Sequence, residues 1–359
     1  MDTRTLFSQH SDEIIEAYRW GIDNKIACHD DYLLEQKKRS AKLITYYLVI
    51  CVINKNKKIG NRVTLLNGMS QKDNAESKKL PLNVFRGKWF NSICELRNGT
   101  TIVSPFSLTE RINILYQAIT SARAKKIDIE ETGPWLDFYF LVSFLSRQFI
   151  KTVNGRGHYD QNATWLGFLS RIIGYEYNIY QHGVVSKKVD VPHKFPCDKV
   201  FVFDNYSANV FKNNIILNDD CQYEVIDFSP SVKFQKIEKN QPYIYIGLVE
   251  QNDPNWINNM VKLLQNNNVI IYVMKHPLTD YHYQSTENII VTDKKILNLD
   301  LIVSYNSTLV LDYIRAGYSK DIVITDAKNA EIFADYDQVQ LVTDEKVLKQ
   351  KIRKMREER

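Results

Sequence analysis

The sequence predicts an α/β protein with two domains. The chain has 359 residues, more than a single domain usually holds. Its second half alternates short runs of β-branched and apolar residues with segments of helical periodicity. That alternation is typical of parallel sheets covered by helices on both faces. The change from a helix-rich half to this regular pattern falls within residues 226–242. We therefore expect two α/β domains, residues 1–228 and residues 229–359.

Composition restricts the class of protein. Apolar residues make up 44% of the chain and charged residues 25%, as in globular proteins. The net charge of +5 favours anionic ligands or an anionic membrane surface, but it is far below that of a nucleic-acid-binding tail, so we expect no nucleic-acid partner. The five cysteines show no CxxC spacing, which predicts reduced thiols and no structural zinc site.

A cytoplasmic location is expected, with contact at the inner face of the cytoplasmic membrane as an alternative. The longest apolar stretches, residues 43–53 and 138–145, are too short to span a bilayer, and the first residues have no apolar signal-peptide segment. The basic segment 349–356 has two interpretations. It either touches anionic lipid as a peripheral membrane contact, or it is a solvated helix end where cations are favoured.

The first half is predicted to be rich in helices. Ser107 and Glu110 form a capping-box pattern at the start of a helix, and the aromatic residues of 134–153 predict a long helix buried in the core. We expect helices over residues 14–18, 31–52, 107–124, 134–153, 162–173 and from about 206, strands over 63–66, 100–103, 176–180 and 200–204, and a polar loop over 54–80.

The second half is predicted to form a parallel sheet. Its apolar runs are short and rich in β-branched residues, and helical segments separate several of them. We expect strands over residues 243–247, 269–274, 288–291, 299–303, 321–325 and 339–342, and helices over 254–265, 309–316 and 345–358.

Two strand ends in this half carry polar residues that suit an anion. Lys275-His276-Pro277 follows the strand 269–274, and Pro277 cannot continue the ladder. Ser304 to Thr308 lead into the helix 309–316, with Asn306 or Ser307 as its N-cap. Ligands of open parallel sheets bind beside strand carboxyl ends, and helix N-termini favour anions such as a diphosphate or a phosphodiester. The structural alternative is a loop histidine and an ordinary helix cap.

Three titratable residues of the first half also lie beside strand or helix ends. His158 and Asp160 belong to a turn-rich loop, and His182 follows the strand 176–180 within Gln181-His182-Gly183. Catalytic groups are often mounted on such loops, although each histidine is also consistent with a structural role. Asp335 and Asp337 formally make a DxD pair, which we interpret as solvated, so no metal site is predicted.

These motifs, taken in order, resemble those of a known group. Gln181-His182-Gly183, Lys275-His276-Pro277 and the run from Ser304 to Thr308 occur in the order and spacing of bacterial cell-surface glycosyltransferases of the GT-B architecture. That group includes capsule polysaccharide transferases, sialyl- and polysialyltransferases and teichoic acid polyol-phosphate polymerases. The resemblance covers residues 150–345. It implies two Rossmann-like domains that face a central cleft, with an acceptor-side first domain and a donor-binding second domain.

The resemblance also implies roles for particular residues. In inverting transfer an acceptor hydroxyl loses its proton as it attacks, and the leaving phosphate is stabilised. The implied base is His182, Asp160 or His158. An acidic Asp/Glu–Asp/Glu–Gly motif, which several sialyltransferase families use as the base, is absent here. The implied donor-binding residues are His276, Lys275, Pro277, Ser304, Asn306, Ser307, Thr308, Gly247 and Gln251.

We therefore expect a metal-independent, inverting glycosyltransferase that needs no cofactor. It would transfer a sugar from a nucleotide-sugar donor, with a CMP-linked nonulosonic acid such as sialic acid as the first candidate. The acceptor would be a cell-surface or lipid-linked glycan of capsule, O-antigen or lipooligosaccharide. Three alternatives stay open. They are a CDP-polyol phosphotransferase of teichoic acid type, a sugar-nucleotide epimerase on the same fold, and a non-catalytic nucleotide- or glycan-binding protein.

Overall fold

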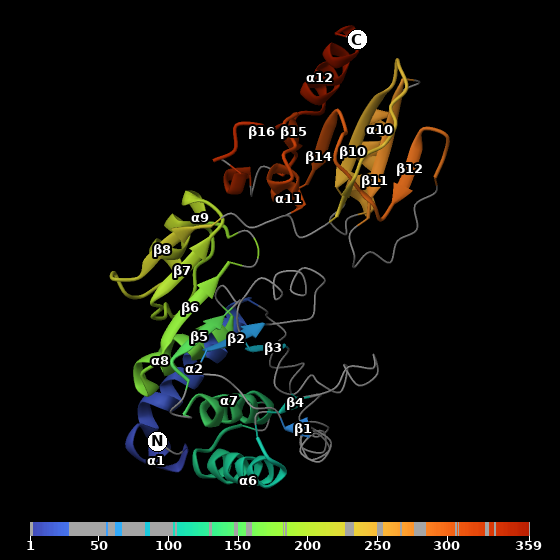
Figure 1. Cartoon of the computed structure of the whole chain (residues 1–359). Helices are drawn as coiled ribbons and strands as arrows, with labels where there is room; N and C mark the ends of the chain where they lie inside the picture. The colour runs from blue at the N-terminus through green and yellow to red at the C-terminus, as the bar shows by residue number, and fades with distance from the viewer. Residues whose placement is uncertain are drawn as a thin grey trace. The chain divides into compact units, whose positions relative to one another are not determined.

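The computed structural model divides the chain into two compact units. The first comprises Met1–Phe203 with Ala208–Val225, and the second Asp204–Ser207 with Ile226–Arg359 (Figure 1). Each unit is built on its own six-stranded parallel sheet, so the predicted α/β class is confirmed. The structure describes residues 3–28, 55–56, 62–66, 83–86, 103–104, 106–128, 131–146, 150–155, 160–181, 183, 185–226, 233–249, 254–265, 268–275, 285–305, 307, 309–326, 330–333 and 335–358.

The sheet of the first unit has the strand order β3-β2-β5-β6-β7-β8. From β2 the chain first adds β3 on one side and later β5 on the other. The connections therefore change direction between β2 and β5, which makes this the topological switch point of the sheet. The strands span β2 Arg62–Leu66, β3 Asn83–Arg86, β5 Thr152–Gly155, β6 Glu176–Tyr180, β7 Lys199–Val202 and β8 Gln222–Val225, and a separate pair is formed by β1 Lys55–Asn56 and β4 Val103–Ser104.

Helices pack around the aromatic helix α7 in this unit. Its aromatic side chains are buried as predicted, and Trp135 and Phe138 surround Tyr18 of α2 with ring centroids 5.0 and 5.4 Å away. The predicted capping box of α6 is present, because the Ser107 hydroxyl accepts the Glu110 N–H and the Glu110 carboxylate accepts the Ser107 N–H. The helices are α1 Thr3–Gln9, α2 Ser11–Cys28, α6 Leu108–Ala124, α7 Thr132–Leu145, α8 Gln161–Ile173 and α9 Asn205–Val210, followed by a π-helical turn at Phe211–Ile215.

One predicted element of this unit is wrong. Residues 134–153 were expected to form a single helix, but α7 ends at Leu145 and Thr152–Gly155 form β5. Ile150, Thr152 and Val153 are β-branched residues that favour a strand. They continue the apolar run of the helix, which hides the boundary in the sequence. The predicted helix over 31–52 lies outside the described residues, as does most of the loop over 54–80.

The sheet of the second unit has the order β12-β11-β10-β14-β15-β16. Its chain first moves from β10 to β11 and β12, then crosses to β14 on the other side of β10. The switch point of this sheet thus lies between β10 and β14. The strands span β10 Ile244–Val249, β11 Val269–Met274, β12 Ile289–Thr292, β14 Leu301–Ser304, β15 Ile322–Ile324 and β16 Val339–Leu341, and β9 Phe234–Gln235 pairs with β13 Lys295–Ile296.

Apolar side chains of the sheet and its helices form the core of the second unit. Ile246, Leu248 and Val273 are buried on the strands, and Ile257 of α10 and Ile352 of α12 pack against them. The predicted strand 269–274 matches β11 residue for residue, while other ends shift by one or two positions. The helices are α10 Pro254–Leu264, α11 Leu309–Arg315 and α12 Glu345–Glu357, with a 3₁₀ turn at Ala330–Phe333.

A buried ion cluster closes the amino-terminal edge of this sheet. Asp300 precedes β14 and is 3% exposed, and its Oδ1 accepts hydrogen bonds from the ammonium groups of Lys239 and Lys320 at 2.7 Å each. Its Oδ2 accepts the Tyr245 N–H at 2.9 Å. Burial by itself raises the pKa of Asp300, but the three hydrogen bonds lower it more, to about 2.

Replacement of Asp300 tests this cluster. Because the folded pKa lies below the unfolded value, the charged carboxylate stabilises the fold above about pH 4, and this contribution is lost as the pH falls toward 2. We expect Asp300→Asn to lower the free energy of unfolding by about 2 to 3 kcal/mol at pH 7, and by much less near pH 2.5. Urea unfolding at both pH values measures the difference.

Asp321→Asn is the matched control. Asp321 pairs with Lys351 but its side chain is 47% exposed, so we expect a loss below about 1 kcal/mol at pH 7. Equal losses in the two variants would mean that the Asp300 cluster contributes no more than a surface ion pair.

Candidate functional site

The predicted donor-side residues of the second unit follow strands β10, β11 and β14 at one edge of the sheet. Val249 pairs with both Met274 and Ser304, so the last residues of these three strands lie in one row. Strand β10 lies between the other two, which places Lys275 and Ser304 about 10 Å apart, or two strand spacings. The sequence did not predict this order, because the pairing joins segments that are far apart in the chain.

Ser304 and Ser307 shape the turn that leads into α11. Ser304 is fully buried, and its hydroxyl accepts the Ser307 N–H at 3.1 Å. The Ser307 hydroxyl accepts the Leu309 N–H at 3.3 Å, which caps the seven-residue helix. Both hydroxyls are therefore engaged with the backbone of their own turn. Their direct contact with phosphate, which the resemblance implies, stays a prediction.

Two lysines meet at the end of β11. Lys275 is half-buried, and its N–H donates to the carbonyl of Thr292 at 3.1 Å. Its carbonyl in turn accepts the ammonium group of Lys295 at 2.8 Å. Lys295 therefore adds a second positive charge to this edge. No motif marks Lys295 in the sequence. It follows β12, and the pairing of β12 with β11, which sets Thr292 opposite Met274, brings it to this edge.

Gly247 has a packing role in the structure. It lies inside β10, where a Cβ atom would come within 2.5 Å of Cδ1 of Leu299 and 2.8 Å of Cε of Met274. A larger residue would force these buried side chains aside. The contact between Gly247 and a nucleotide stays a prediction.

The remaining donor-side candidates lie outside the described residues. Each of them follows one of these three strands in the sequence. Gln251 follows β10, the pair His276 and Pro277 follows β11, and Asn306 and Thr308 follow β14.

Asp160 is the N-cap of α8 in the first unit. Its Oδ1 accepts the Ala163 N–H at 2.9 Å, and the helix begins at Gln161, one residue before the predicted start at 162. The loop that ends at Asp160 follows β5, the strand that borders the switch point. His158 belongs to this loop and lies outside the described residues.

A buried tyrosine lies close to this loop. Oη of Tyr177 would be 2.7 Å from a Cβ atom on Gly155, the last residue of β5. Burial raises the pKa of Tyr177 well above its usual value, and the nearby Cys197 and Asp160 add smaller effects in the same direction. The hydroxyl therefore stays protonated. This hydroxyl has no hydrogen-bond partner within the described part of the chain. No motif marks Tyr177, whose residue type and position are ordinary for a strand.

Gln181 holds the Gln-His-Gly segment in place. It is fully buried just after β6; its Oε1 accepts the Phe203 N–H at 2.7 Å, and its Nε2 donates to the Gly183 carbonyl at 2.8 Å. The Gln181 N–H also donates to the carbonyl of Phe201 at 2.9 Å. His182 lies outside the described residues, but both of its chain neighbours are fixed at the carboxyl ends of β6 and β7.

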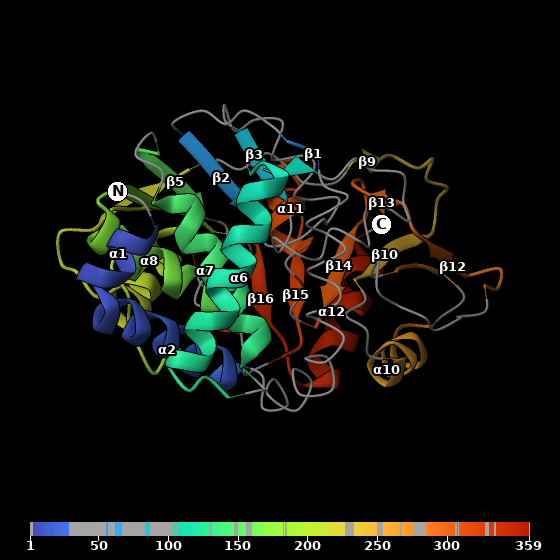
Figure 2. The same cartoon turned by 90° about the horizontal axis from the view of Figure 1, so that it is seen from below.

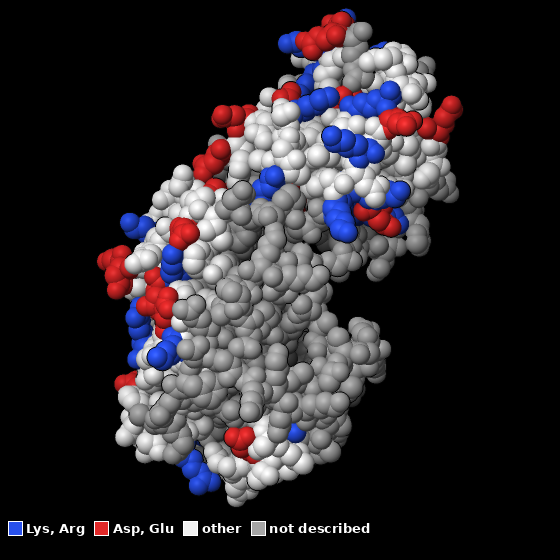
Figure 3. All heavy atoms as spheres, in the orientation of Figure 1, with Lys and Arg blue, Asp and Glu red and all other residues white. Residues whose placement is uncertain are grey.

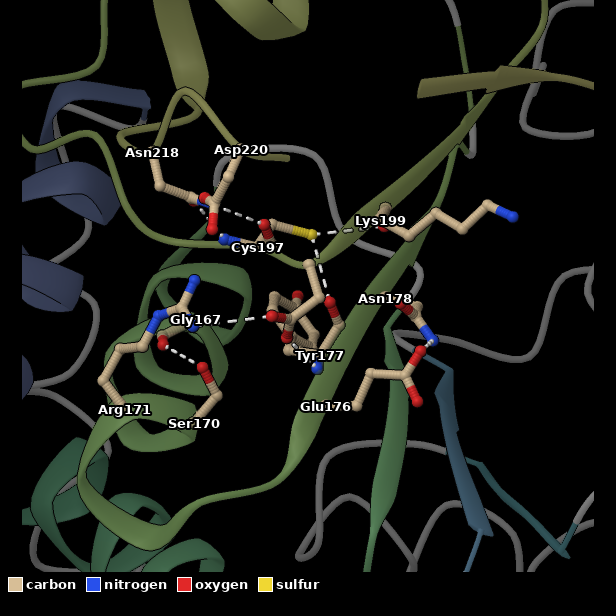
Figure 4. A network of polar contacts seen from close by, with 11 residues as sticks. Gly167, Ser170, Arg171, Glu176, Tyr177, Asn178, Cys197, Lys199, Asn218 and Asp220 are labelled. Carbon is tan, nitrogen blue, oxygen red and sulfur yellow. Dashed lines mark hydrogen bonds and ion pairs between the residues drawn. The ribbon is translucent and has the colours of Figure 1, made fainter. Parts of the chain in front are cut away.

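A polar network fixes the opposite, amino-terminal ends of β6 and β7 (Figure 4). The Asp198 carboxylate accepts the Tyr177 N–H at 2.7 Å, and the Asn218 side chain bonds both backbone groups of Cys197 at 2.9 and 3.1 Å. The Cys197 thiol donates to backbone carbonyls, and Cys197 and Cys221 are free, as predicted for these two cysteines. This network anchors the strands at the edge remote from Asp160 and Gln181.

The described residues show no cluster of three His, Cys, Asp or Glu side chains suited to a metal ion. Asp335 of the DxD pair accepts the Tyr206 N–H at 3.0 Å within the second unit. No helix in the described ranges combines the length and apolarity needed to cross a membrane. The face drawn in Figure 3 carries basic and acidic side chains interspersed on both units.

Comparisons with known proteins give low similarity. No family model matches the chain, and no curated protein matches it. Among solved structures, one similar chain is described as "Spinosyn Forosaminyltransferase SpnP", with a TM-score of 0.44 and 10% identity over 79% of this chain and 86% of that one. Another is described as "Structure of the Wall Teichoic Acid Polymerase TagF, H548A", with a TM-score of 0.41 and 10% identity over 94% and 88%. Similarity this low assigns no function.

Removal of the Gln181 side chain tests its anchoring role. Gln181→Ala leaves the Phe203 N–H and the Gly183 carbonyl without these partners, so we expect a loss of about 2 kcal/mol in the free energy of unfolding. Gln222→Ala, at an exposed position on β8, is expected to change it by less than about 0.5 kcal/mol. Urea unfolding measures the stability of both variants. If the Gln181→Ala protein is as stable as the control, Gln181 does not anchor this segment.

Proposed function

We propose that the chain is an inverting, metal-independent glycosyltransferase of the GT-B type, acting from a nucleotide-sugar donor on a glycan or lipid-linked glycan acceptor. One observation carries the proposal. In both units the candidate residues follow strands at or beside the switch point of a parallel sheet, where ligands of such sheets bind. In the second unit, Gln251 follows β10 and Ser304 is the last residue of β14, the two strands that border this point. In the first unit, Asp160 ends the loop after β5.

The charge at the edge of the second sheet supports donor binding there. The Lys295 ammonium group bonds the carbonyl of Lys275, the residue that precedes His276 in the chain, and Lys275 adds a second positive charge to the same segment. A leaving nucleoside mono- or diphosphate carries negative charge, which fixed cations stabilise as it develops. We therefore assign the donor phosphate to the second unit and the proton acceptor to the first.

The donor class is tested by nucleotide release. Purified protein is incubated with a glycan acceptor and, separately, with a CMP-linked nonulosonic acid, a CDP-polyol and a panel of UDP-sugars. We expect CMP release from the nonulosonic acid donor. We also expect His276→Ala to lower turnover about 100-fold or more, because one group that stabilises the leaving phosphate is lost.

Lys294→Ala is the control, since Lys294 is an exposed neighbour of Lys295 and should change turnover by less than about twofold. Release of CDP from a polyol donor would establish the phosphotransferase alternative instead. Conversion of the donor without any acceptor would indicate an epimerase. Nucleotide binding without turnover of any donor would indicate a non-catalytic binding protein.

The base is tested by separating the capping role of Asp160 from its charge. Asp160→Asn keeps a side-chain oxygen that can cap α8 but removes the carboxylate. If Asp160 is the base, this variant keeps its stability and loses activity about 100-fold or more; if it is a cap alone, activity stays near that of the wild type.

His182→Asn and His158→Asn are measured in the same assay. The base is assigned to the variant whose turnover falls without loss of donor affinity. Wild-type turnover in all three variants would exclude the three candidates together and overturn the assignment of the base to these loops.

A further inference from the structure

We propose that helix α6 docks the protein on an anionic membrane surface. Seven large hydrophobic side chains of the described residues are exposed, and three of them belong to this one helix. Leu108, Ile112 and Tyr116 are 42%, 51% and 66% exposed. They recur every four residues, so they form one stripe about 12 Å long on a single face of the helix.

This stripe is separate from the face by which α6 packs on the fold. Ile114, Leu115 and Ala118 are buried, and the Trp135 indole N–H of α7 donates to the Ala118 carbonyl at 3.1 Å. Figures 1 and 2 show α6 on the outer side of α7. The buried face of α6 is therefore formed by residues other than Leu108, Ile112 and Tyr116.

Basic residues continue the stripe toward the C-terminal end of α6. Arg123 lies two turns beyond Tyr116 on the same face, and Lys126 follows the end of the helix; both are exposed. The C-cap residue Lys125 is also exposed, and its ammonium group donates to the Ser11 hydroxyl. The acidic residue of α6, Glu110, is held by its capping box at the start of the helix. An apolar stripe with a tyrosine and adjacent cations is the pattern by which helices lie in the interface of an anionic bilayer.

The alternatives fit these observations less well. Three side chains expose a small part of the roughly 800 Å² that each partner buries in a stable protein interface. The C-terminal helix α12 is also basic, but its apolar residues Leu348 and Ile352 are packed into the core of the second unit, and Val347 is its one residue among the seven exposed hydrophobic side chains. The structure thus favours α6 over the segment 349–356 as the lipid contact.

Vesicle flotation of the full-length protein tests the proposal. We expect binding to phosphatidylcholine vesicles that contain 30% phosphatidylglycerol, and much weaker binding to phosphatidylcholine alone. Ile112→Ser with Tyr116→Ser should lower the bound fraction at least about fivefold, because both side chains lose apolar contact. Arg123→Gln with Lys126→Asn should remove the preference for the anionic vesicles.

The matched control is Leu217→Ser with Val225→Ser, which removes two equally exposed hydrophobic side chains elsewhere on the first unit and should leave binding unchanged. No binding by the wild type, or equal loss in the control, would overturn the proposal. If the wild type is a dimer and the variant Ile112→Ser with Tyr116→Ser is a monomer, the stripe binds a second copy of the chain instead. The assay contains no donor or acceptor, so its outcome is independent of the proposed function.

Discussion

The parallel direction of every strand within each six-stranded sheet is the constraint on which the rest of the structure depends. It brings all carboxyl ends of a sheet to one edge and all amino ends to the other. In the second unit, Val249, Met274 and Ser304 therefore end in one row although they are far apart in sequence. The connections leave β10 in both directions, which makes this part of the carboxyl edge the switch point, where ligands of parallel sheets bind.

The opposite edges are closed by polar contacts. At the amino-terminal edge of the second sheet, Asp300 accepts hydrogen bonds from two lysines and a backbone N–H. At that edge of the first sheet, Asp198 and Asn218 bond the backbone of the strands. These groups satisfy one another, so they stabilise the sheets and present little to a substrate. The amino-terminal edges are thus occupied by structural contacts, whereas the candidate residues lie at or after the carboxyl ends of the strands.

Local patterns predicted the elements whose limits are marked by the sequence itself. Strands β6 and β11 match their predicted ranges, since each apolar run ends at a turn-forming or proline-containing segment. The boundary of α7 was hidden, because the apolar run continues from the helix into β5. At α8, Asp160 precedes Asn162 and Thr164, and any of these three residues can cap a helix, so the side-chain geometry decides.

Non-local features escaped prediction for a different reason. The insertion of β10 between β11 and β14, the approach of Lys295 to Lys275 and the position of Tyr177 beside Gly155 all depend on pairing between distant segments. The fold class of each half and the candidate loops were accessible from the sequence. The distances between candidates were not, because no local pattern encodes the strand order.

The structure also changes the physical basis expected for anion binding. The sequence suggested a helix N-terminus lined by hydroxyls, but α11 has seven residues, and the hydroxyls of Ser304 and Ser307 already accept backbone N–H groups. Serine hydroxyls used in this way orient the turn through their oxygen atoms, and each keeps its O–H as a donor for a ligand. Positive charge at the end of β11, from Lys275 and Lys295, is a second source of attraction for an anion at this edge, and the sequence pattern included only Lys275.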